Sequence, residues 1–369
     1  MDEGAENPTT QFFIHRPGMV HMKIIRRKAL KIILPVLLMI FLAGVGYINL
    51  LLPIITGYSA KYLCSAVFVS HRDAKETEGL ELAFFPIRYV CNRIDTLNRS
   101  VTSRLLWGSS VAIYREGLGA VLVRGADTGK LRKFHFKETT ENTAKNGFLF
   151  HETGTLYKEA RGLPGTGFRL FHQKLYGGEP FAFLVVHHGQ LIHEQYRQGF
   201  THETRFPGWS VAKSITNAMA GIRVLEGKLL PDRPADLEEW RDDDRKSITT
   251  SHLLQMVSGL EWDENYGNRS DVTRMLYEES DFSRFALQRP LVDQPGAHWN
   301  YSSGSTNIVC LIVRKSFPSD AGYHAGIRAK LFQPVGMDSA VLETDATGIP
   351  AGSSYIFGTA RDYARFGLL

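Results

Sequence analysis

Cysteine is scarce in this 369-residue sequence, which contains only Cys64, Cys91 and Cys310. Three cysteines are too few for the disulfide framework that holds small secreted domains together. In an exported protein Cys64 and Cys91 could pair, and Cys310 would then remain free within the apolar run 308–313. The sequence therefore allows at most one disulfide, and the pair Cys64–Cys91 is our hypothesis for it.

Cofactor motifs are also missing from the sequence. It has no phosphate-binding glycine loop and no metal-ligand spacing. His187 and His188 are adjacent, but neither His193 nor His202 is followed by a second histidine four residues later, as a zinc-protease helix requires. We interpret His187 and His188 as surface or turn residues, and we predict that the protein needs no cofactor and no metal.

A basic surface that could bind nucleic acid is absent as well. The formal net charge is +5, but residues 1–31 hold six basic and three acidic side chains, a net of +3, which leaves +2 for the rest of the chain. The positive excess is thus largely a flank of the segment that follows. We predict no nucleic-acid partner.

What the sequence does contain, at residues 32–55, is an uncharged apolar run long enough to cross a bilayer as a helix. Basic residues precede it, so the positive-inside rule places residues 1–31 in the cytoplasm and exports the remainder. A cleaved signal peptide is the alternative, although the run is longer than a usual signal core and no small-x-small cleavage site follows directly. A buried core helix is a third reading, which the basic flank argues against.

Short β-rich runs follow the apolar segment. Residues 66–69, 111–114 and 120–123 are predicted strands. The runs 181–186 and 191–196 flank a short turn that contains glycine, which predicts a hairpin. Between these two groups, the glycine- and proline-rich stretch 162–167 is a plausible domain boundary.

The stretch 208–217, Gly-Trp-Ser-Val-Ala-Lys-Ser-Ile-Thr-Asn, contains a Ser-x-x-Lys pattern at the start of an apolar helix. Residues three apart lie on one face of a helix, so the Ser210 hydroxyl and the Lys213 amine can meet. A serine hydroxyl needs an adjacent base to become a good nucleophile, and a lysine can serve if its amine is partly desolvated. The alternative is an ordinary amphipathic helix with an exposed lysine.

A second candidate lies in the stretch 294–304, where proline and glycine predict a turn just ahead of an apolar helix. This turn presents Tyr301, whose phenol could relay the proton that leaves the serine, and Ser303 could hold a polar group of the substrate. The alternative reading makes Tyr301 a core aromatic residue and Ser302-Ser303 a helix cap.

Together these pieces resemble the serine β-lactamase-like superfamily, in particular its class C-like esterases and 6-aminohexanoate-dimer hydrolases. The matching stretches are residues 206–214, 253–260, 261–266, 294–303 and 359–367. The resemblance implies an α/β (α+β) fold, with a β-lactamase/transpeptidase-like antiparallel sheet and a helical subdomain. It divides the chain into a basic cytoplasmic tail (1–31), a transmembrane helix (32–55), an N-terminal extension (56–165) and a hydrolase domain (166–369).

The resemblance also implies roles for the candidate residues. Ser210 would be the acylated nucleophile, Lys213 its base partner and Tyr301 the second proton-transfer residue. Ser303 and Tyr266 would contact the substrate, and Trp209, next to the nucleophile, is a further candidate contact. The expected function is cleavage of an amide or ester in a small molecule by a single-pass membrane protein whose hydrolase domain is exported.

One departure from the family pattern concerns the C-terminal strands. Members of the family continue past the helix that contains residues 359–367 into strands that carry a third motif, Lys-Thr-Gly or a substitute, and half of the oxyanion hole. No Lys-Thr-Gly occurs here, and His324-Ala325-Gly326 lies too early, in a helical context. We therefore expect a partial chain that lacks these strands.

Two alternative functions stay open beside the hydrolase: a catalytically impaired binding protein of the cell envelope, and an enzyme of the β-lactamase or D-alanyl carboxypeptidase type.

Overall fold

The computed structural model of the chain describes residues 18–136 and 180–369. By its contacts the chain divides into two compact units, Met1–Leu50 and Leu51–Leu369. The predicted domain boundary at 162–167 lies outside the described residues, so its position stays a prediction.

Helix α1 (Gly18–Phe68) contains the apolar run that the sequence predicted to span a membrane. From Ile33 to Leu50 the apolar side chains of this helix are mostly exposed; Ile33 and Phe41, for example, are 51% and 64% exposed. In the described part of the chain this is the one helix long and apolar enough to cross a bilayer.

Within the second unit, the last turns of α1 pack into the hydrophobic core. Leu52, Leu63 and Cys64 are buried there. The predicted strand at 66–69 is wrong, because residues 66–68 continue the helix. Ala-Val-Phe-Val has strand-like composition, but extending an existing helix costs little, and the buried Ala66 and Val69 find core contacts in this way.

All strand pairs among the described residues are antiparallel, as expected. They form a four-stranded sheet in the order β1-β2-β3-β4, a hairpin β5-β6 and a three-stranded sheet in the order β7-β9-β8. The strands are β1 Cys91–Asp95, β2 Ser100–Leu105, β3 Gly108–Arg115, β4 Gly119–Leu122, β5 Ala182–His187, β6 Gln190–Tyr196, β7 Arg205–Pro207, β8 Val341–Leu342 and β9 Ile356–Thr359.

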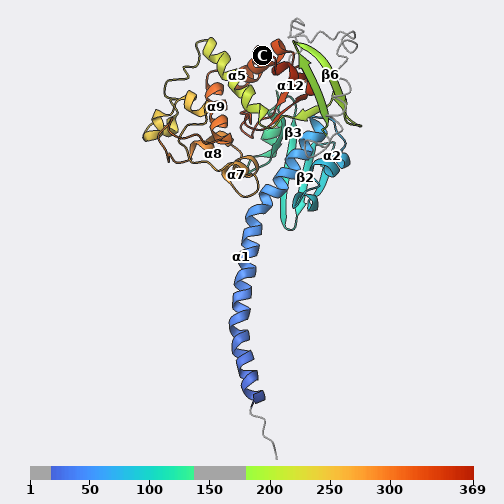
Figure 1. Cartoon of the computed structure of the whole chain (residues 1–369), viewed down its shortest axis with the longest axis vertical. Helices are drawn as coiled ribbons and strands as arrows, with labels where there is room; N and C mark the ends of the chain where they lie inside the picture. Colours follow the sequence, from blue (N-terminus) through green and yellow to red (C-terminus); the bar gives the residue numbers. More distant parts are fainter. Residues whose placement is uncertain (1–17, 137–179) are drawn as a thin grey trace, which may run out of the picture. The chain divides into compact units, whose positions relative to one another are not determined.

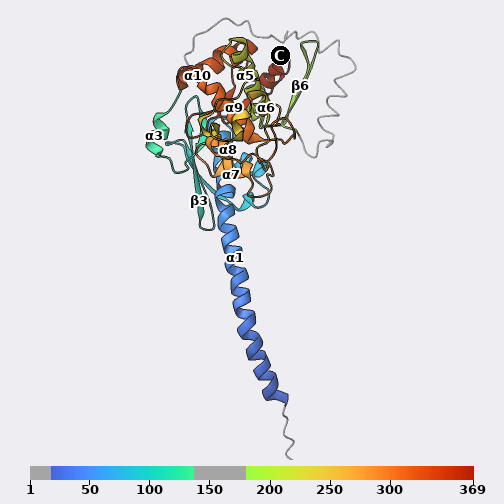
Figure 2. The same cartoon turned by 90° about the vertical axis from the view of Figure 1, so that its left-hand side faces the viewer.

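The helices of the second unit lie mainly to one side of the strands (Figure 1). Helix α9 packs against α5, α6 and α8, and the turned view in Figure 2 shows α5, α6 and α9 close together. The helices are α2 Ala74–Glu81, α3 Thr128–Lys133, α5 Val211–Leu225, α6 Thr250–Leu254, α7 Asp271–Tyr277, α8 Phe282–Leu287, α9 Ser303–Lys315, α10 Asp320–Ile327, α11 Gln333–Val335 and α12 Ala360–Phe366. Shorter turns are η1 Ile87–Tyr89, η2 Glu238–Trp240, η3 Asp244–Ser247 and the π-helical η4 Arg328–Phe332.

The structure confirms the predicted strands at 111–114 and 120–123, which lie in β3 and β4, and the hairpin at 181–196. The predicted Cys64–Cys91 disulfide is wrong, because both cysteines are free. Cys64 is buried in the core on α1, whereas Cys91 is exposed at the start of the edge strand β1. Cys310 is also free and is buried on α9.

Side chains of helix α12 bind both β6 and β7, the strand that precedes the candidate serine. Arg361 makes a bidentate ion pair with Glu194 of β6, with nitrogen–oxygen distances of 2.8 and 2.7 Å. Tyr363 donates a hydrogen bond to the carbonyl of Phe206 in β7 (2.8 Å). Strand β7 leads directly to Ser210, so these contacts fix the backbone from which the serine projects.

Candidate functional site

Ser210 stands at the junction between β7 and α5. It is the N-cap residue of α5, but its side chain makes no capping hydrogen bond. Lys213, one turn along the helix, donates to the Ser210 Oγ across 3.3 Å. The structure thus brings the predicted serine and lysine together, with a hydroxyl that is not committed to the helix end.

Polar groups from three segments surround the Lys213 amine. Besides Ser210, its Nζ contacts the Ser303 Oγ at 3.0 Å and the Ser353 carbonyl oxygen at 2.9 Å. No carboxylate in the described part of the chain forms an ion pair with this amine. Three oxygen contacts suit an ammonium with three donors. They equally suit a neutral amine that donates to Ser303 and Ser353 and turns its lone pair to the Ser210 hydroxyl.

Tyr301 joins this cluster through its ring. The Lys213 Nζ lies 4.7 Å from the ring centroid, and the ring also contacts Trp299. The phenol hydroxyl makes no hydrogen bond to Ser210 or to Lys213. The structure therefore places the predicted tyrosine beside the amine but turns its face, not its hydroxyl, toward it, and its role as a proton relay stays a prediction.

Glu264 is part of the cluster, although our sequence reasoning did not single it out. Its carboxylate accepts hydrogen bonds from the Ser303 hydroxyl (2.5 Å) and the Ser303 N–H (2.8 Å), and also from the Tyr266 hydroxyl (2.8 Å) and the Trp262 indole. The available signal was its place in the matched stretch 261–266, two residues before Tyr266. Glu264 holds Ser303 in place, and Ser303 in turn contacts the lysine.

Tyr266 lies in the loop before α7, and its hydroxyl donates to the same Glu264 Oε1 that accepts from the Ser303 hydroxyl. Partial burial and the neighbouring Glu264 carboxylate raise the pKa of the Tyr266 phenol above its ordinary value. The phenol therefore stays protonated at neutral pH and can donate a hydrogen bond. The residue lines the same cavity as Ser210, which suits its predicted contact with a substrate.

Trp209, the residue before the serine, has a strained backbone. Its φ of 45° lies in the left-handed region, which is rare for a bulky side chain. Its ring lies against Tyr58 and Tyr62 of α1, with centroid distances of 6.4 and 6.0 Å, and against Tyr355 at 6.2 Å. Helix α1 therefore helps to fix the residue that leads into Ser210, and backbone strain of this kind concentrates at functional sites.

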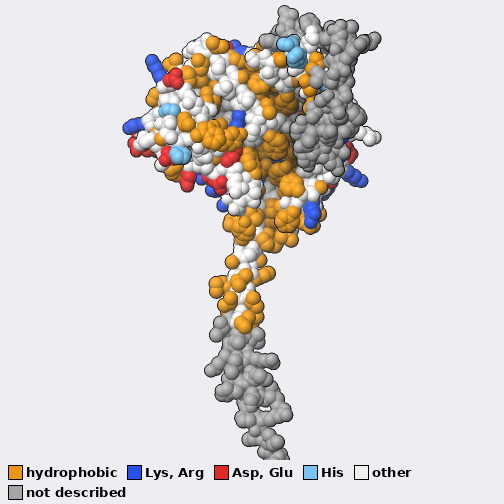
Figure 3. Space-filling model, viewed as in Figure 1, with side chains coloured by type: hydrophobic (Ala, Val, Ile, Leu, Met, Phe, Trp, Pro, Cys, Tyr) orange, Lys and Arg blue, Asp and Glu red, His pale blue; other side chains and the backbone are white. Residues whose placement is uncertain are grey.

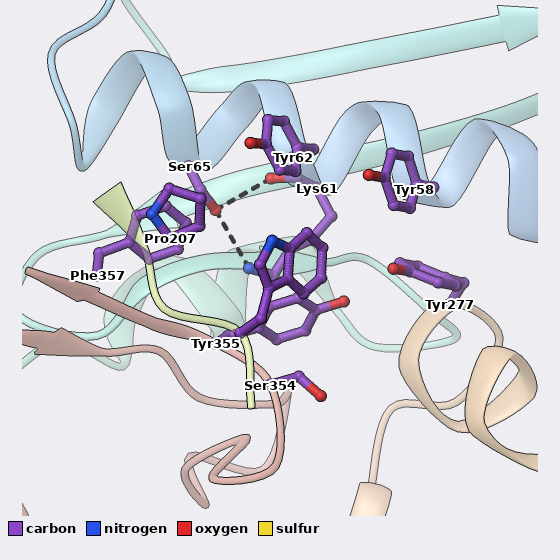
Figure 4. A pocket seen from close by; sticks show the side chains of 10 residues that line it. Tyr58, Lys61, Tyr62, Ser65, Pro207, Tyr277, Ser354, Tyr355 and Phe357 are labelled. Carbon is purple, nitrogen blue, oxygen red and sulfur yellow. Dashed lines mark hydrogen bonds between the residues drawn. The ribbon is translucent and has the colours of Figure 1, made fainter. Parts of the chain in front are cut away.

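A second lysine–serine pair lies on α1, as Figure 4 shows. The Lys61 Nζ is 3.2 Å from the Ser65 Oγ and forms a buried ion pair with Glu343. Lys61 also lies over the ring of Tyr355, 3.9 Å from its centroid. The free space beside this group is about 10 Å³, which is room for no more than one water molecule.

A cavity of about 700 Å³ opens at Ser210. One side is polar or aromatic and includes Trp209, Ser210, Tyr266 and Ser354. A further part of the lining is largely apolar and comes from α1 and the loop after α2: Leu51, Ile54, Ile55, Tyr58, Phe84 and Phe85. Figure 3 shows hydrophobic side chains concentrated in the middle of the face of the second unit that is turned to the viewer. The volume lies within the range of small-molecule binding sites.

His187 and His188 are exposed at the turn between β5 and β6, as predicted. Within residues 18–136 and 180–369, no group of three or more histidine, cysteine or acidic side chains is arranged to hold a metal ion.

Comparison with known proteins gives consistent matches to the second unit. A sequence model of the Beta-lactamase family matches residues 175–369. The 6-aminohexanoate-dimer hydrolase of Paenarthrobacter ureafaciens is 26% identical over 200 residues, which is 50% of this chain and 50% of that protein. The chain thus spans about half the length of this curated relative.

Two solved structures are also similar to the chain. A Bacillus anthracis protein provisionally described as a 6-aminohexanoate-dimer hydrolase is 25% identical, with a TM-score of 0.45, over 50% of this chain and 52% of that one. A β-lactamase/D-alanine carboxypeptidase of Yersinia pestis is 16% identical, with a TM-score of 0.41, over 50% of this chain and 61% of that one.

Proposed function

Because the chain belongs to the Beta-lactamase family, we propose that it is a serine hydrolase that cleaves an amide or ester through an acyl-enzyme on Ser210. One observation carries the proposal. The Ser210 hydroxyl lies 3.3 Å from a lysine amine that has no carboxylate partner among the described residues, at the edge of a cavity large enough for a substrate.

The chemistry starts with the transfer of the Ser210 hydroxyl proton to the neutral amine of Lys213. The Oγ then bonds to the substrate carbonyl carbon, and the negative charge moves to the carbonyl oxygen. Within the described part of the chain the Ser210 N–H has no hydrogen-bond acceptor, so it is available to stabilise this oxyanion. Collapse of the intermediate breaks the carbonyl–nitrogen or carbonyl–oxygen bond and leaves the acyl group on Ser210.

The leaving group must take up a proton, and Tyr301 beside Lys213 is the candidate to deliver it. Catalytic hydrogen bonds are often long before a substrate binds, so the phenol need not contact Ser210 in the free protein. Water then attacks the acyl group with Lys213 or Tyr301 as the base, which restores the serine hydroxyl. Ser303, Tyr266 and Trp209 would orient the substrate.

The proposed substrate class is supported by the name of the curated relative, a 6-aminohexanoate-dimer hydrolase. Amides of 6-aminohexanoate and small esters are therefore the proposed substrates. The exposed apolar helix supports a membrane anchor, and its basic N-terminal flank supports an exported hydrolase unit.

The test is to trap the acyl-enzyme. We expect that acid quenching of the full-length chain during turnover of p-nitrophenyl acetate or a 6-aminohexanoate dimer leaves a mass increase equal to the acyl group. The increase should be absent in Ser210→Ala. An unmodified wild-type protein that also fails to hydrolyse either substrate would contradict the proposed function.

A further inference from the structure

One wall of the cavity beside Ser210 is formed by residues that precede the family match in the sequence. We infer that residues 51–87 form a binding surface for the hydrocarbon part of the substrate, and this inference rests on the proposed function. The match covers residues 175–369, whereas Leu51, Ile55 and Phe84 line the cavity from the N-terminal side. The family residues supply the reacting groups, and the segment before them selects the substrate.

The chemistry of this wall fits a hydrocarbon. Leu51, Ile54 and Ile55 have no polar side-chain atoms, and Phe84 and Phe85 are 48% and 74% exposed. Large exposed apolar side chains at the rim of a cavity gain free energy when a ligand covers them. The polar groups of the lining include the hydroxyls of Ser210 and Tyr266. A carbonyl held there directs an attached aliphatic or aromatic chain toward the wall.

The wall contacts Trp209, the residue that precedes the serine. Tyr58 of α1 lies 5.8 Å from the Phe84 ring, 5.7 Å from Tyr277 and 6.4 Å from Trp209, between centroids. One turn later, Lys61 forms its buried ion pair with Glu343. Figure 4 shows Tyr58, Lys61 and Tyr62 along one face of α1, next to Tyr277 and Tyr355. The end of α1 therefore acts as a built part of the site.

The test measures how kcat/KM depends on the length of the hydrocarbon chain in an ester substrate. The 369-residue protein is held in lipid nanodiscs. One series varies the acyl chain of p-nitrophenyl esters from acetate to octanoate. The other varies the alcohol of acetate esters from ethyl to octyl. A methylene that moves from water to an apolar wall contributes about a fourfold gain. We expect that slope in one of the two series, which identifies the side of the substrate that contacts residues 51–87.

Ile55→Ser and Phe84→Ser should each reduce the gain to less than about twofold per methylene in that series. Leu80→Ser is the matched control, because Leu80 lies in the same segment on α2 but does not line the cavity; its slope should equal that of the wild type. Labelling of Ser210 by a small fluorophosphonate checks that each variant keeps a folded nucleophile.

Equal slopes in the wild type and in both labelled wall variants would overturn the inference while leaving the proposed function intact. A flat wild-type profile in both series, with active enzyme, would overturn it as well. A wild-type protein that neither hydrolyses esters nor reacts with the probe would overturn the proposed function itself, and the inference with it.

Discussion

Two lysine–serine pairs in this protein have almost the same nitrogen–oxygen distance but contrasting surroundings. In α5 the Lys213 amine lies 3.3 Å from the Ser210 hydroxyl, and in α1 the Lys61 amine lies 3.2 Å from the Ser65 hydroxyl. Lys61 is paired with the buried Glu343 in a space of about 10 Å³, whereas Lys213 has hydroxyl and carbonyl neighbours beside a cavity of about 700 Å³.

The difference indicates what turns such a pair into a reactive site. The buried Glu343 carboxylate binds the Lys61 amine and also accepts a hydrogen bond from the Ser65 hydroxyl, so both groups of this pair are committed to it. The enclosure of the pair also leaves no room for a carbonyl substrate. Among the described residues Lys213 has no carboxylate partner, and its serine lines the larger cavity. Proximity of a serine and a lysine is therefore not enough to make a catalytic pair. The lysine must also be free of a carboxylate partner, and the serine must open onto a cavity.

The largest expected effect separates the two serines. Ser210→Ala should lower ester hydrolysis by about 10⁴-fold or more, because no other group can carry the acyl intermediate. Ser65→Ala should leave kcat within about threefold and instead destabilise the fold by about 1–3 kcal/mol, because the buried Glu343 loses a hydrogen-bond donor. Kinetics and urea unfolding of both variants check this; equal loss of activity in both would break the comparison.

Replacement of the two lysines should also have opposite effects, on stability in one case and on kcat in the other. Lys61→Met leaves the buried Glu343 carboxylate without its partner and should destabilise the protein by about 3–5 kcal/mol. Lys213→Met should lower kcat by about 10²–10⁴-fold with little change in stability, because it removes the proposed general base from a partly open site. Thermal unfolding and steady-state rates give the two readouts. A folding defect in Lys213→Met with unchanged kcat per folded molecule would refute the assignment.

The variant Tyr301→Phe distinguishes a proton-relay role of Tyr301 from a role in packing alone. Tyr301→Phe keeps the ring over Lys213 but removes the hydroxyl, so we expect kcat to fall by about 10²-fold. The effect should be larger for an amide than for a p-nitrophenyl ester, whose leaving group needs no proton. Equal kcat values for wild type and Tyr301→Phe on both substrates would show that only the ring contributes.

The smallest expected effect concerns Glu264, which acts through Ser303. Glu264→Gln should lower kcat/KM by about tenfold, because an amide cannot accept all four hydrogen bonds that now hold Ser303, Tyr266 and Trp262. Glu261→Gln, an exposed change in the same loop, is the matched control. Rates unaffected by Glu264→Gln would remove Glu264 from the site.

Much of this arrangement could be predicted from the sequence, for physical reasons that differ by residue. Ser210 and Lys213 are three apart on one helix, so local geometry brings them together. Tyr301 follows a Pro-Gly turn, and the family resemblance places it at the site. Glu264 and the Lys61–Glu343 pair could not be predicted, because their contacts depend on tertiary packing between distant segments. The strand expected at 66–69 was wrong for a different reason, because the continuing helix α1 overrode local strand propensity.

The most direct test of the account is to map where a fluorophosphonate probe reacts on the 369-residue chain. After labelling and proteolysis, mass spectrometry should find the phosphonyl group on the peptide that contains Ser210, and none on the peptide that contains Ser65. Modification of Ser65, or a folded protein with no modification at Ser210, would contradict the claim that the unpaired lysine and the open cavity make Ser210 the nucleophile.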